Sequence, residues 1–427
     1  MIADRLRAAA DALEADAEAL VALAGEESHL PPARLTGELA RTTGQLRMFA
    51  DLVVDGACFD AVIEHGEPDL RRVGAAIGPV VVFAASNFPF AFSVAGGDTA
   101  AALAAGCPVV VKAHHGHPRL SDRVGALLAD AGLPVSVIHG EDAGRAALLD
   151  PATRAAAFTG STAGGRALFD LACGRPDPIP FYGELGSVNP VFVSSGAATA
   201  RGAEIAAGFV ASFTLGVGQF CTKPGLLLLP DGHELDAELE RLVEKVEPAP
   251  MLGHWIEDRF RADLALRRDR LELLAEGPGA TLLRANTVDR DLLDVEVFGP
   301  TAVVVTYADA TDLLAVAAEL QGSLTAAVHS QPEETEWAAP LVEALAAKVG
   351  RVIHDGWPTG VAVSPAMHHG GPWPATTAPL HSSVGGNSIT RFLRPTAYQG
   401  VPDALLPPAL QEANPLGIRR RVDGAMT

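Results

Sequence analysis

Three side chains that lie far apart in the sequence are of types that act together on carbonyl groups. Cys221 follows a glycine-containing stretch, and a thiolate on such a loop can attack a carbonyl carbon because glycine permits close substrate approach. Glu184 stands between glycines in mostly apolar surroundings, where partial burial raises a carboxyl pKa and suits it to take a proton from water. Asn87 precedes Phe-Pro and has an amide that can donate to a developing oxyanion. These residues supply a nucleophile, a general base and an oxyanion donor.

Each of the three also has an ordinary structural explanation. A lone cysteine is usually a small buried hydrophobic residue, a glutamate between glycines a surface turn, and an asparagine before Phe-Pro a turn former. The other cysteines, Cys58, Cys107 and Cys173, lie in helix-like or strand-entry segments. Because no two cysteines form a Cys-x-x-Cys pair, the sequence predicts neither a zinc site nor a disulfide framework, and we expect no metal.

A second group of residues is suited to hold a nucleotide. The segment 158–165, Phe-Thr-Gly-Ser-Thr-Ala-Gly-Gly, ends an expected strand and opens an expected helix, whose free backbone N–H groups can bind pyrophosphate. It is not a Gly-x-Gly-x-x-Gly motif, and glycine-rich turns are common. Lys112 ends another expected strand and can reach a ribose or phosphate, although a strand-end lysine is usually a solvated charge.

These residues follow short apolar segments that alternate with helical patterns. The expected strands and helices lie, in order, at 79–85, 97–106, 108–112, 120–131, 133–138 and 155–158. This alternation is typical of a parallel α/β sheet that is covered on both faces. Ligands bind beyond the carboxyl ends of such strands, and Asn87, Lys112 and Gly160 are expected there.

Further patterns flank this sheet. Two amphipathic helices are expected before it, up to Ala24 and over 35–54. A second α/β region follows, with a domain boundary near residue 187 and segments at 208–218, 226–229 and 300–307. The chain is loop-rich over 368–386, resembles a strand over 391–398, and carries little periodicity from Pro408 onward.

Composition and charge disfavour several classes of partner. Among 427 residues, 32 Lys and Arg stand against 52 Asp and Glu, and the formal charge of -20 argues against nucleic acid and anionic membranes as partners. The longest apolar runs are far shorter than the roughly 20 residues that span a bilayer. The N-terminus alternates apolar and acidic residues instead of forming a secretory signal, so we expect a cytoplasmic protein.

Taken in chain order, the motifs resemble those of the aldehyde dehydrogenase superfamily. They are Asn-Phe-Pro, Val-Val-Lys, Phe-Thr-Gly-Ser-Thr, Glu-Leu-Gly-Ser, Gly-Gln-x-Cys and Glu-Val-Phe-Gly-Pro, and the resemblance covers about residues 35–398. The motifs at 354–360 and 369–377 resemble the branch of 2-oxoglutarate semialdehyde and NADP-dependent fatty aldehyde dehydrogenases. The implied α/β fold has a Rossmann-type cofactor domain (1–186, with a shortened hairpin at about 60–78), a catalytic domain (187–390) and a C-terminal strand and tail (391–427), with a small oligomerisation element.

The resemblance also implies an activity, the NAD(P)-dependent oxidation of an aldehyde to a carboxylic acid. Cys221 would form a thiohemiacetal and then a thioester, Glu184 would be the general base, and Asn87 with the Cys221 backbone N–H would form the oxyanion hole. The family implies these cofactor contacts: Lys112 to the adenosine ribose, Gly160, Ser161 and Gly165 in the turn at the pyrophosphate and nicotinamide, Glu296 to the nicotinamide ribose and Phe298 to the ring.

One departure from the family bears on the choice of cofactor. Relatives that prefer NAD usually carry a glutamate three residues after the lysine, where it would repel a 2′-phosphate, and His115 takes that place here. We therefore expect NADP as the preferred cofactor, with NAD as the alternative. A metal site at His114, His115 and His117 would also explain this cluster, but adjacent loop histidines rarely converge on one ion.

Other departures keep alternatives open. The chain starts late, and its hairpin and the interval from Cys221 to Glu296 are short. These departures would fit a shortened, weakly active or inactive aldehyde-dehydrogenase-like scaffold, although a scaffold needs none of the catalytic side chains. Acyl transfer to coenzyme A is a further alternative, which the retained Glu184 disfavours. The family implies a homodimer or homotetramer acting on a small-molecule aldehyde, and the aromatic residues Phe88 and Phe220 suit an apolar substrate tail.

Overall fold

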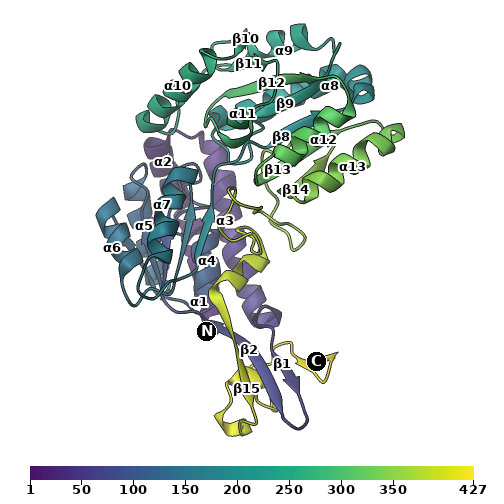
Figure 1. Cartoon of the computed structure of the whole chain (residues 1–427). Coiled ribbons are helices and arrows are strands. Elements are labelled where there is room, and N and C mark those ends of the chain that lie inside the picture. Colours follow the sequence, from purple (N-terminus) through teal and green to yellow (C-terminus); the bar gives the residue numbers. More distant parts are fainter.

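Figure 1 shows a chain built in three parts, each with its own β-sheet. The computed structural model describes the backbone of residues 1–427 and every side chain except those of Asp291 and Asp294. The α-helices are α1 (Ile2–Ala15), α2 (Ala17–Ser28), α3 (Pro32–Asp55), α4 (Gly97–Ala104), α5 (Pro118–Asp130), α6 (Glu141–Leu149), α7 (Thr162–Cys173), α8 (Ser195–Thr214), α9 (Asp236–Val243), α10 (His254–Arg268), α11 (Arg290–Asp294), α12 (Ala310–Glu319) and α13 (Thr335–Ala346).

The strands and the short 3-10 helices complete the element order. The strands are β1 (Val62–Glu64), β2 (Leu70–Ala76), β3 (Val80–Phe83), β4 (Val109–Lys112), β5 (Val135–Ile138), β6 (Ala155–Thr159), β7 (Phe181–Glu184), β8 (Pro190–Val193), β9 (Leu226–Pro230), β10 (Glu272–Glu276), β11 (Thr281–Ala285), β12 (Thr301–Tyr307), β13 (Ser323–His329), β14 (Val349–His354), β15 (Leu393–Gln399), β16 (Arg421–Val422) and β17 (Ala425–Met426). The 3-10 helices are η1 (Ala57–Phe59), η2 (Leu215–Gly218), η3 (Pro332–Glu334), η4 (Gly386–Phe392), η5 (Asp403–Leu405) and η6 (Pro408–Leu410).

The middle part is a five-stranded parallel sheet in the order β5-β4-β3-β6-β7. Side chains of β3 alternate between its faces, and both faces are buried, which explains its unbroken Val-Val-Val-Phe sequence. Val80 and Val82 pack with α1, α3, α4 and α5, whereas Val81 and Phe83 pack with α6 and α7. The four strands expected from the sequence are therefore confirmed, and β7 is a fifth that the sequence analysis did not identify.

The upper part is a seven-stranded sheet in the order β10-β11-β12-β9-β8-β13-β14. All neighbours are parallel except β10 and β11, which are antiparallel. Helices α8 and α9 cover one face and α12 and α13 the other, each over its own apolar core. This is the second α/β region, and the boundary expected near residue 187 lies between β7 and β8.

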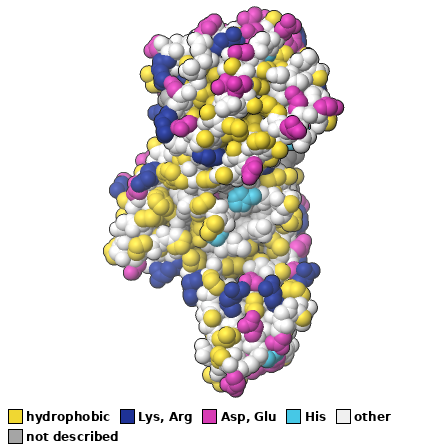
Figure 2. Space-filling model, turned by 45° about the vertical axis from the view of Figure 1, so that its right-hand side comes forward, with side chains coloured by type: hydrophobic (Ala, Val, Ile, Leu, Met, Phe, Trp, Pro, Cys, Tyr) yellow, Lys and Arg dark blue, Asp and Glu magenta, His cyan; other side chains and the backbone are white. Residues whose placement is uncertain are grey.

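The lower part is a narrow sheet in the order β15-β2-β1-β16-β17. A short hairpin, β1 and β2, lies within the expected segment 60–78, and β15 pairs antiparallel with the whole of β2. The expected strand at 391–398 begins slightly later, because residues up to Phe392 belong to η4. Figure 2 shows Lys and Arg side chains where this part meets the middle part. No helix among the described residues is long and apolar enough to cross a membrane.

The carboxyl ends of the middle strands converge on the junction with the upper part. Asn87 follows β3, Lys112 ends β4 and Gly160 follows β6, as the sequence predicted. Glu184 ends β7, where an isolated antiparallel bridge to Thr376 brings in the loop of residues 368–386. This loop follows β14 of the upper sheet, so both parts contribute residues to one site.

Candidate active site

Cys221 lies in a tightly constrained loop between α8 and β9. Gly216, Val217 and Gly218 have φ angles of 58°, 60° and 65°, so three successive residues adopt the left-handed region. A Cβ atom on Gly218 would lie 2.2 Å from the carbonyl oxygen of Gly299, which leaves room for glycine alone. Val217 is β-branched, and such strain costs about 1–3 kcal/mol and persists only where its surroundings hold it. Residues 216–218, which lead to Cys221, are therefore fixed in place by the residues that pack around them.

Asn189 fixes the same loop through side-chain hydrogen bonds. Its side chain is fully buried, and Nδ2 donates to the carbonyl oxygens of Cys221 at 2.8 Å and Lys223 at 3.0 Å. Its Oδ1 accepts from both the backbone and the hydroxyl of Thr325 in β13. Asn189 lies five residues after Glu184 in the segment that enters β8, so it ties the nucleophile's loop to the strand that carries the carboxylate.

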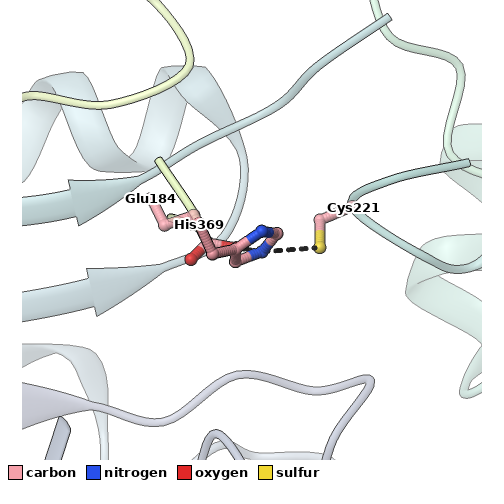
Figure 3. Close-up of side chains that lie close together, drawn as sticks. All are labelled: Glu184, Cys221 and His369. Carbon is pink, nitrogen blue, oxygen red and sulfur yellow. Dashed lines mark hydrogen bonds and ion pairs between the residues drawn. The ribbon is translucent and has the colours of Figure 1, made fainter. Parts of the chain in front are cut away.

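Figure 3 shows the imidazole of His369 between the thiol of Cys221 and the carboxylate of Glu184. His369 Nε2 lies 3.7 Å from Cys221 Sγ and 2.9 Å from Glu184 Oε1. The side chains of His369 and Glu184 are only 1% and 3% exposed. Sulfur, nitrogen and oxygen atoms of the three residues all lie within 4.8 Å of one another. The structure thus unites Cys221 with Glu184, and it adds His369, to which the sequence analysis gave no role.

The loop of residues 368–386 places His369 by backbone pairing. The N–H of Leu185 donates to Ala375 O at 2.8 Å, and the N–H of Thr377 donates to Gly183 O at 3.0 Å. The loop also packs closely on β14, because a Cβ atom on Gly350 would lie 2.2 Å from the carbonyl oxygen of Gly370.

Two serines then fix the histidine itself. The backbone N–H of His369 donates to Ser382 Oγ at 3.0 Å, and the N–H of Ser383 donates to His369 O at 2.9 Å. The hydroxyl of Ser383 also donates to Glu184 Oε2. Glu184 therefore receives a hydrogen bond on one oxygen and contacts the imidazole with the other.

The pKa of Glu184 differs from the sequence expectation. Burial raises the pKa of this carboxyl, but the charge and hydrogen bond of His369, together with Ser383, outweigh burial and hold it below its usual value. The prediction of a raised pKa was therefore wrong, since it considered burial without these partners. The glutamate is ionised at neutral pH and presents a charge to the imidazole.

Cys221 has the opposite perturbation. Burial raises the pKa of its thiol well above the ordinary value, and the negative charges of Glu184 and Glu296 raise it further. The resting residue is thus a protonated thiol. A thiolate forms only when a neighbouring base removes the proton, and His369 Nε2 is the nearby ring nitrogen in contact with the sulfur.

Asn87 is brought to the nucleophile's loop, as expected. It is buried, and its Nδ2 donates to the carbonyl oxygen of Gln219 at 3.1 Å, two residues before Cys221. Gln219 in turn accepts from the N–H of Leu252 at 2.9 Å, which fixes its orientation. An amide nitrogen carries two protons, and the bond to Gln219 uses one of them.

The expected phosphate-binding turn lies directly beside Glu184. The N–H of Gly160 donates to Glu184 O at 3.0 Å, and the Ser161 hydroxyl caps α7 by accepting from the N–H of Gly164. A Cβ atom on Gly165 would lie 2.1 Å from Leu185 Cδ2, so glycine lets α7 pack closely on this strand. The helix begins next to Glu184, and backbone N–H groups at its start can bind an anion.

Glu296 reaches the same junction from the upper part. A Cβ atom on Gly186 would lie 2.8 Å from Glu296 Oε2 and 3.0 Å from the hydroxyl of Thr162, so this carboxylate stands at the start of α7. Its Oε1 is buried without a hydrogen-bond partner among the described side chains. Burial raises the pKa of Glu296, and the charge of Lys223 opposes that shift. An unpartnered carboxylate oxygen beside a helix N-terminus fits a hydroxyl-bearing nucleotide.

Lys112 and His115 lie on the other side of the sheet's carboxyl edge. Lys112 is partly buried, which lowers its pKa, while Glu141 nearby favours its charged form. The ring of His115 packs against His114 and against Trp255 of α10, with centroids 4.3 Å and 4.4 Å apart. Trp255 of the upper part therefore holds His115, which stands where relatives that prefer NAD usually carry a glutamate.

The neighbouring histidines are engaged by the protein backbone. His117 Nε2 lies 2.9 Å from the carbonyl oxygen of Ala85, and His114 Nδ1 accepts from the N–H of Gly116 at 3.0 Å. These contacts give His114 and His117 a structural role in the loop.

Comparison with known proteins gives the family. The aldehyde dehydrogenase family model matches residues 2–259. The chain is 44% identical, over 98% of its length and 86% of the relative's, to alpha-ketoglutaric semialdehyde dehydrogenase 2 of Azospirillum brasilense. It is 41% identical, over 95% of its length and 83% of the relative's, to alpha-ketoglutaric semialdehyde dehydrogenase of Acinetobacter baylyi.

A solved structure shows the same fold. Proline utilization A of Bradyrhizobium japonicum superposes on 93% of the chain with a TM-score of 0.82, at 23% identity. The chain spans 42% of that longer protein, so the likeness concerns the fold alone. The predicted aldehyde-dehydrogenase-like α/β fold and the predicted oxidoreductase activity are both confirmed. The chain belongs to the aldehyde dehydrogenase family and is an NAD(P)-dependent aldehyde dehydrogenase.

Proposed function

We propose that the protein oxidises a semialdehyde of the alpha-ketoglutaric type to the dicarboxylic acid, using Cys221, His369 and Glu184. The names of the two relatives at 44% and 41% identity support this substrate. The observation that carries the chemistry is the position of His369 Nε2, which contacts the thiol sulfur and the carboxylate at once.

In the first step a base must remove the proton of a high-pKa thiol. In the neutral tautomer whose proton is on Nδ1, His369 takes this proton through Nε2, and ionised Glu184, 2.9 Å from Nε2, stabilises the imidazolium that results. The thiolate then attacks the aldehyde carbon and forms a thiohemiacetal. The amide of Asn87 and the backbone N–H of Cys221 stabilise the oxyanion, with the Asn87 proton that Gln219 does not use.

A bound dinucleotide would supply the hydride acceptor, so that loss of hydride from the thiohemiacetal would leave a thioester on Cys221. Gly160, Ser161 and Gly165 would hold its phosphates at the start of α7, and Glu296 with Phe298 would hold the nicotinamide riboside. The buried unpartnered oxygen of Glu296 is the feature of this chain that best fits a ribose hydroxyl.

Hydrolysis of the thioester needs a base for water. Glu184 alone is a weak base because its pKa is held low, so we assign the role to the Glu184–His369 pair. Once the imidazolium has released the thiol proton to solvent, the imidazole can accept a proton from the attacking water. Retention of this pair beside the thiol supports release of a free acid over acyl transfer to coenzyme A, and over a purely structural role.

NADP is proposed as the preferred cofactor. Lys112 and His115 flank the edge where an adenosine ribose would lie, and neither is acidic, so the two side chains would not repel a 2′-phosphate.

We further propose assembly as a homodimer or homotetramer through the lower sheet. Light scattering of the purified protein tests the assembly.

The experiment that tests the activity supplies alpha-ketoglutaric semialdehyde with NADP or NAD and measures reduced cofactor together with the acid product. We expect equimolar amounts of both products, a higher kcat/KM with NADP, and loss of activity in Cys221→Ala. Oxidation of simple aldehydes with none of this semialdehyde would contradict the substrate. A strong preference for NAD would contradict the cofactor.

A further inference from the structure

Two arginines of α3 lie against aromatic residues in the segments that carry Cys221 and Asn87. The guanidinium carbon of Arg34 lies 4.8 Å from the ring centroid of Phe220 and 5.2 Å from that of Phe88. The guanidinium carbon of Arg41 lies 5.6 Å from the ring centroid of Phe92. Phe220 immediately precedes Cys221 and Phe88 immediately follows Asn87, so both cations adjoin the catalytic loops.

Neither guanidinium is satisfied by the residues that the structure describes. Arg34 donates from Nη2 to the carbonyl oxygen of Asn87 at 2.6 Å, but its Nη1 is buried without a partner. Arg41 has two buried nitrogens, Nε and Nη2, that both lack a hydrogen-bond partner among these residues. A buried cation without hydrogen bonds is costly, which points to a ligand that completes it.

The unpartnered atoms of Arg41 form one particular edge of the guanidinium. Nε and Nη2 together make two parallel hydrogen bonds to a carboxylate. The same edge does so elsewhere in this protein. Nε and Nη2 of Arg71 donate to Asp69 at 2.9 Å and 3.1 Å, and those of Arg123 donate to Asp16, both at 2.5 Å. In Arg41 the edge faces no carboxylate within 4.0 Å among the described side chains.

Glu38, one turn away on α3, does not take that place. Its Oε1 accepts from the N–H groups of Phe90 at 2.7 Å and Ala91 at 2.9 Å, so it anchors the segment after β3. Burial raises the pKa of Glu38 to about 7, against the opposing effect of these hydrogen bonds and of the arginines. Burial lowers the pKa of Arg41, and the charges of Glu38, of the Cys221 thiolate and of Glu184, in this order, favour its charged form. The cation therefore lies within electrostatic reach of the reacting pair.

We propose that the Nε and Nη2 edge of Arg41 binds the distal carboxylate of an oxo acid whose aldehyde carbon reaches Cys221, with Arg34 beside it as a second cation. This inference rests on the proposed function, since it places the far end of the substrate. The rings of Phe88, Phe92 and Phe220 then line the path of the methylene groups, where the sequence alone suggested an uncharged apolar tail.

The test compares two substrates that differ at the far end alone. Glutaric semialdehyde carries a carboxylate there, and pentanal of the same chain length carries a methyl group. In Arg41→Gln we expect kcat/KM for the oxo acid to fall about a hundredfold, mainly through KM, because a charged hydrogen-bonded partner is lost. For pentanal we expect a change below about threefold. Arg41→Lys should recover part of the loss, because it restores the charge without the two-pronged edge.

A matched control variant and a binding measurement distinguish a carboxylate site from a general effect of changing α3. Arg47→Gln alters the same helix but removes exposed ion pairs to Asp11 and Glu14, and it should leave both substrates unaffected. In the Cys221→Ala background, calorimetry should detect glutarate with Arg41 present and lose that binding with Arg41→Gln. Thermal unfolding establishes that each variant is folded.

The outcomes separate this proposal from the proposed function. Equal losses for the oxo acid and pentanal in Arg41→Gln, or unchanged glutarate binding, would overturn the carboxylate site and leave Arg41 as a support for Phe92. A wild-type enzyme that oxidises pentanal better than the oxo acid would also overturn it while the dehydrogenase activity stands. Wild-type protein that reduces no cofactor with either aldehyde would contradict the proposed function itself.

Discussion

Replacing His369 by asparagine separates the base from the rest of the catalytic group. Asparagine keeps a polar group near Glu184 but has no titratable nitrogen to accept the thiol proton. Burial and the negative charges of Glu184 and Glu296 raise the thiol pKa of Cys221 well above its ordinary value. Without a base, such a thiol stays protonated at neutral pH. Removal of the base should slow hydride transfer about 10²- to 10⁴-fold, the usual contribution of general-base catalysis.

Single-turnover measurements over a range of pH provide the assay. Stopped-flow absorbance of reduced cofactor reports hydride transfer, and the rate of alkylation of Cys221 by iodoacetamide reports thiolate formation. In His369→Asn, both rates should be low at neutral pH and rise about tenfold per pH unit as hydroxide replaces the base. The adjacent His368→Asn is the matched control, because Cys221 contacts His369 and the control leaves that contact intact. Its two profiles should remain those of the wild type.

The result that refutes this reasoning is specific. If His369→Asn keeps the wild-type alkylation rate and single-turnover rate at neutral pH, the thiolate forms without the imidazole. His369 would then only orient Glu184, and the contact of 3.7 Å would have no role in activating the thiol.

Four further predictions concern neighbouring residues. Glu184→Gln should give a burst of reduced cofactor followed by slow turnover, and a normal steady-state rate would reject its role in hydrolysis. Asn87→Ala should slow single-turnover hydride transfer about a hundredfold or more, because one oxyanion donor contributes about 2.7–4 kcal/mol; an unchanged rate would remove it from the oxyanion hole. Ser383→Ala removes a hydrogen bond that lowers the Glu184 pKa, so the acidic limb of the kcat profile should move to higher pH, and an unmoved limb would show that Ser383 has no such effect. His115→Glu should lower kcat/KM for NADP relative to NAD, and an unchanged ratio would place the 2′-phosphate elsewhere.

The sequence predicted those features that depend on local patterns. Strands β3 and β6 of the middle sheet appear as runs of valine and alanine because they are largely buried on both faces. Strand ends of one parallel sheet meet at one edge, so Asn87, Lys112 and Gly160 could be placed there without coordinates. Strand β7 was missed because Phe-Tyr-Gly-Glu contains a glycine and a charge, which weaken a strand signal.

The role of His369 could not be predicted in this way. It is 148 residues from Cys221 in the sequence, and the contact exists because residues 368–386 pair with β7. Its histidine-glycine-glycine surroundings gave a family resemblance but no partner, and His368 stands next to it with the same chemistry. The prediction of a raised Glu184 pKa was wrong for the same reason. The apolar surroundings in the sequence suggest burial, whereas the imidazole that lowers the pKa comes from a distant loop.

The position of Arg41 beside the catalytic loops could not be predicted from the sequence either. The helical pattern predicts α3, but the polar side of an isolated helix is expected to face water. The segment after β3 covers that side, through the bonds from Phe90 and Ala91 to Glu38, and buries the guanidinium groups beside the catalytic loops. A tertiary contact thus converts ordinary surface arginines into candidates for substrate recognition.

The central claim is that Cys221 forms a covalent acyl intermediate that the Glu184–His369 pair releases. Intact-protein mass spectrometry of Glu184→Gln, mixed with semialdehyde and NADP and quenched in acid, tests it directly. The account predicts a mass increase equal to one acyl group, mapped by peptide analysis to Cys221 and absent without the dinucleotide. An adduct on Cys58, Cys107 or Cys173, or cofactor reduction that persists in Cys221→Ala, would contradict it.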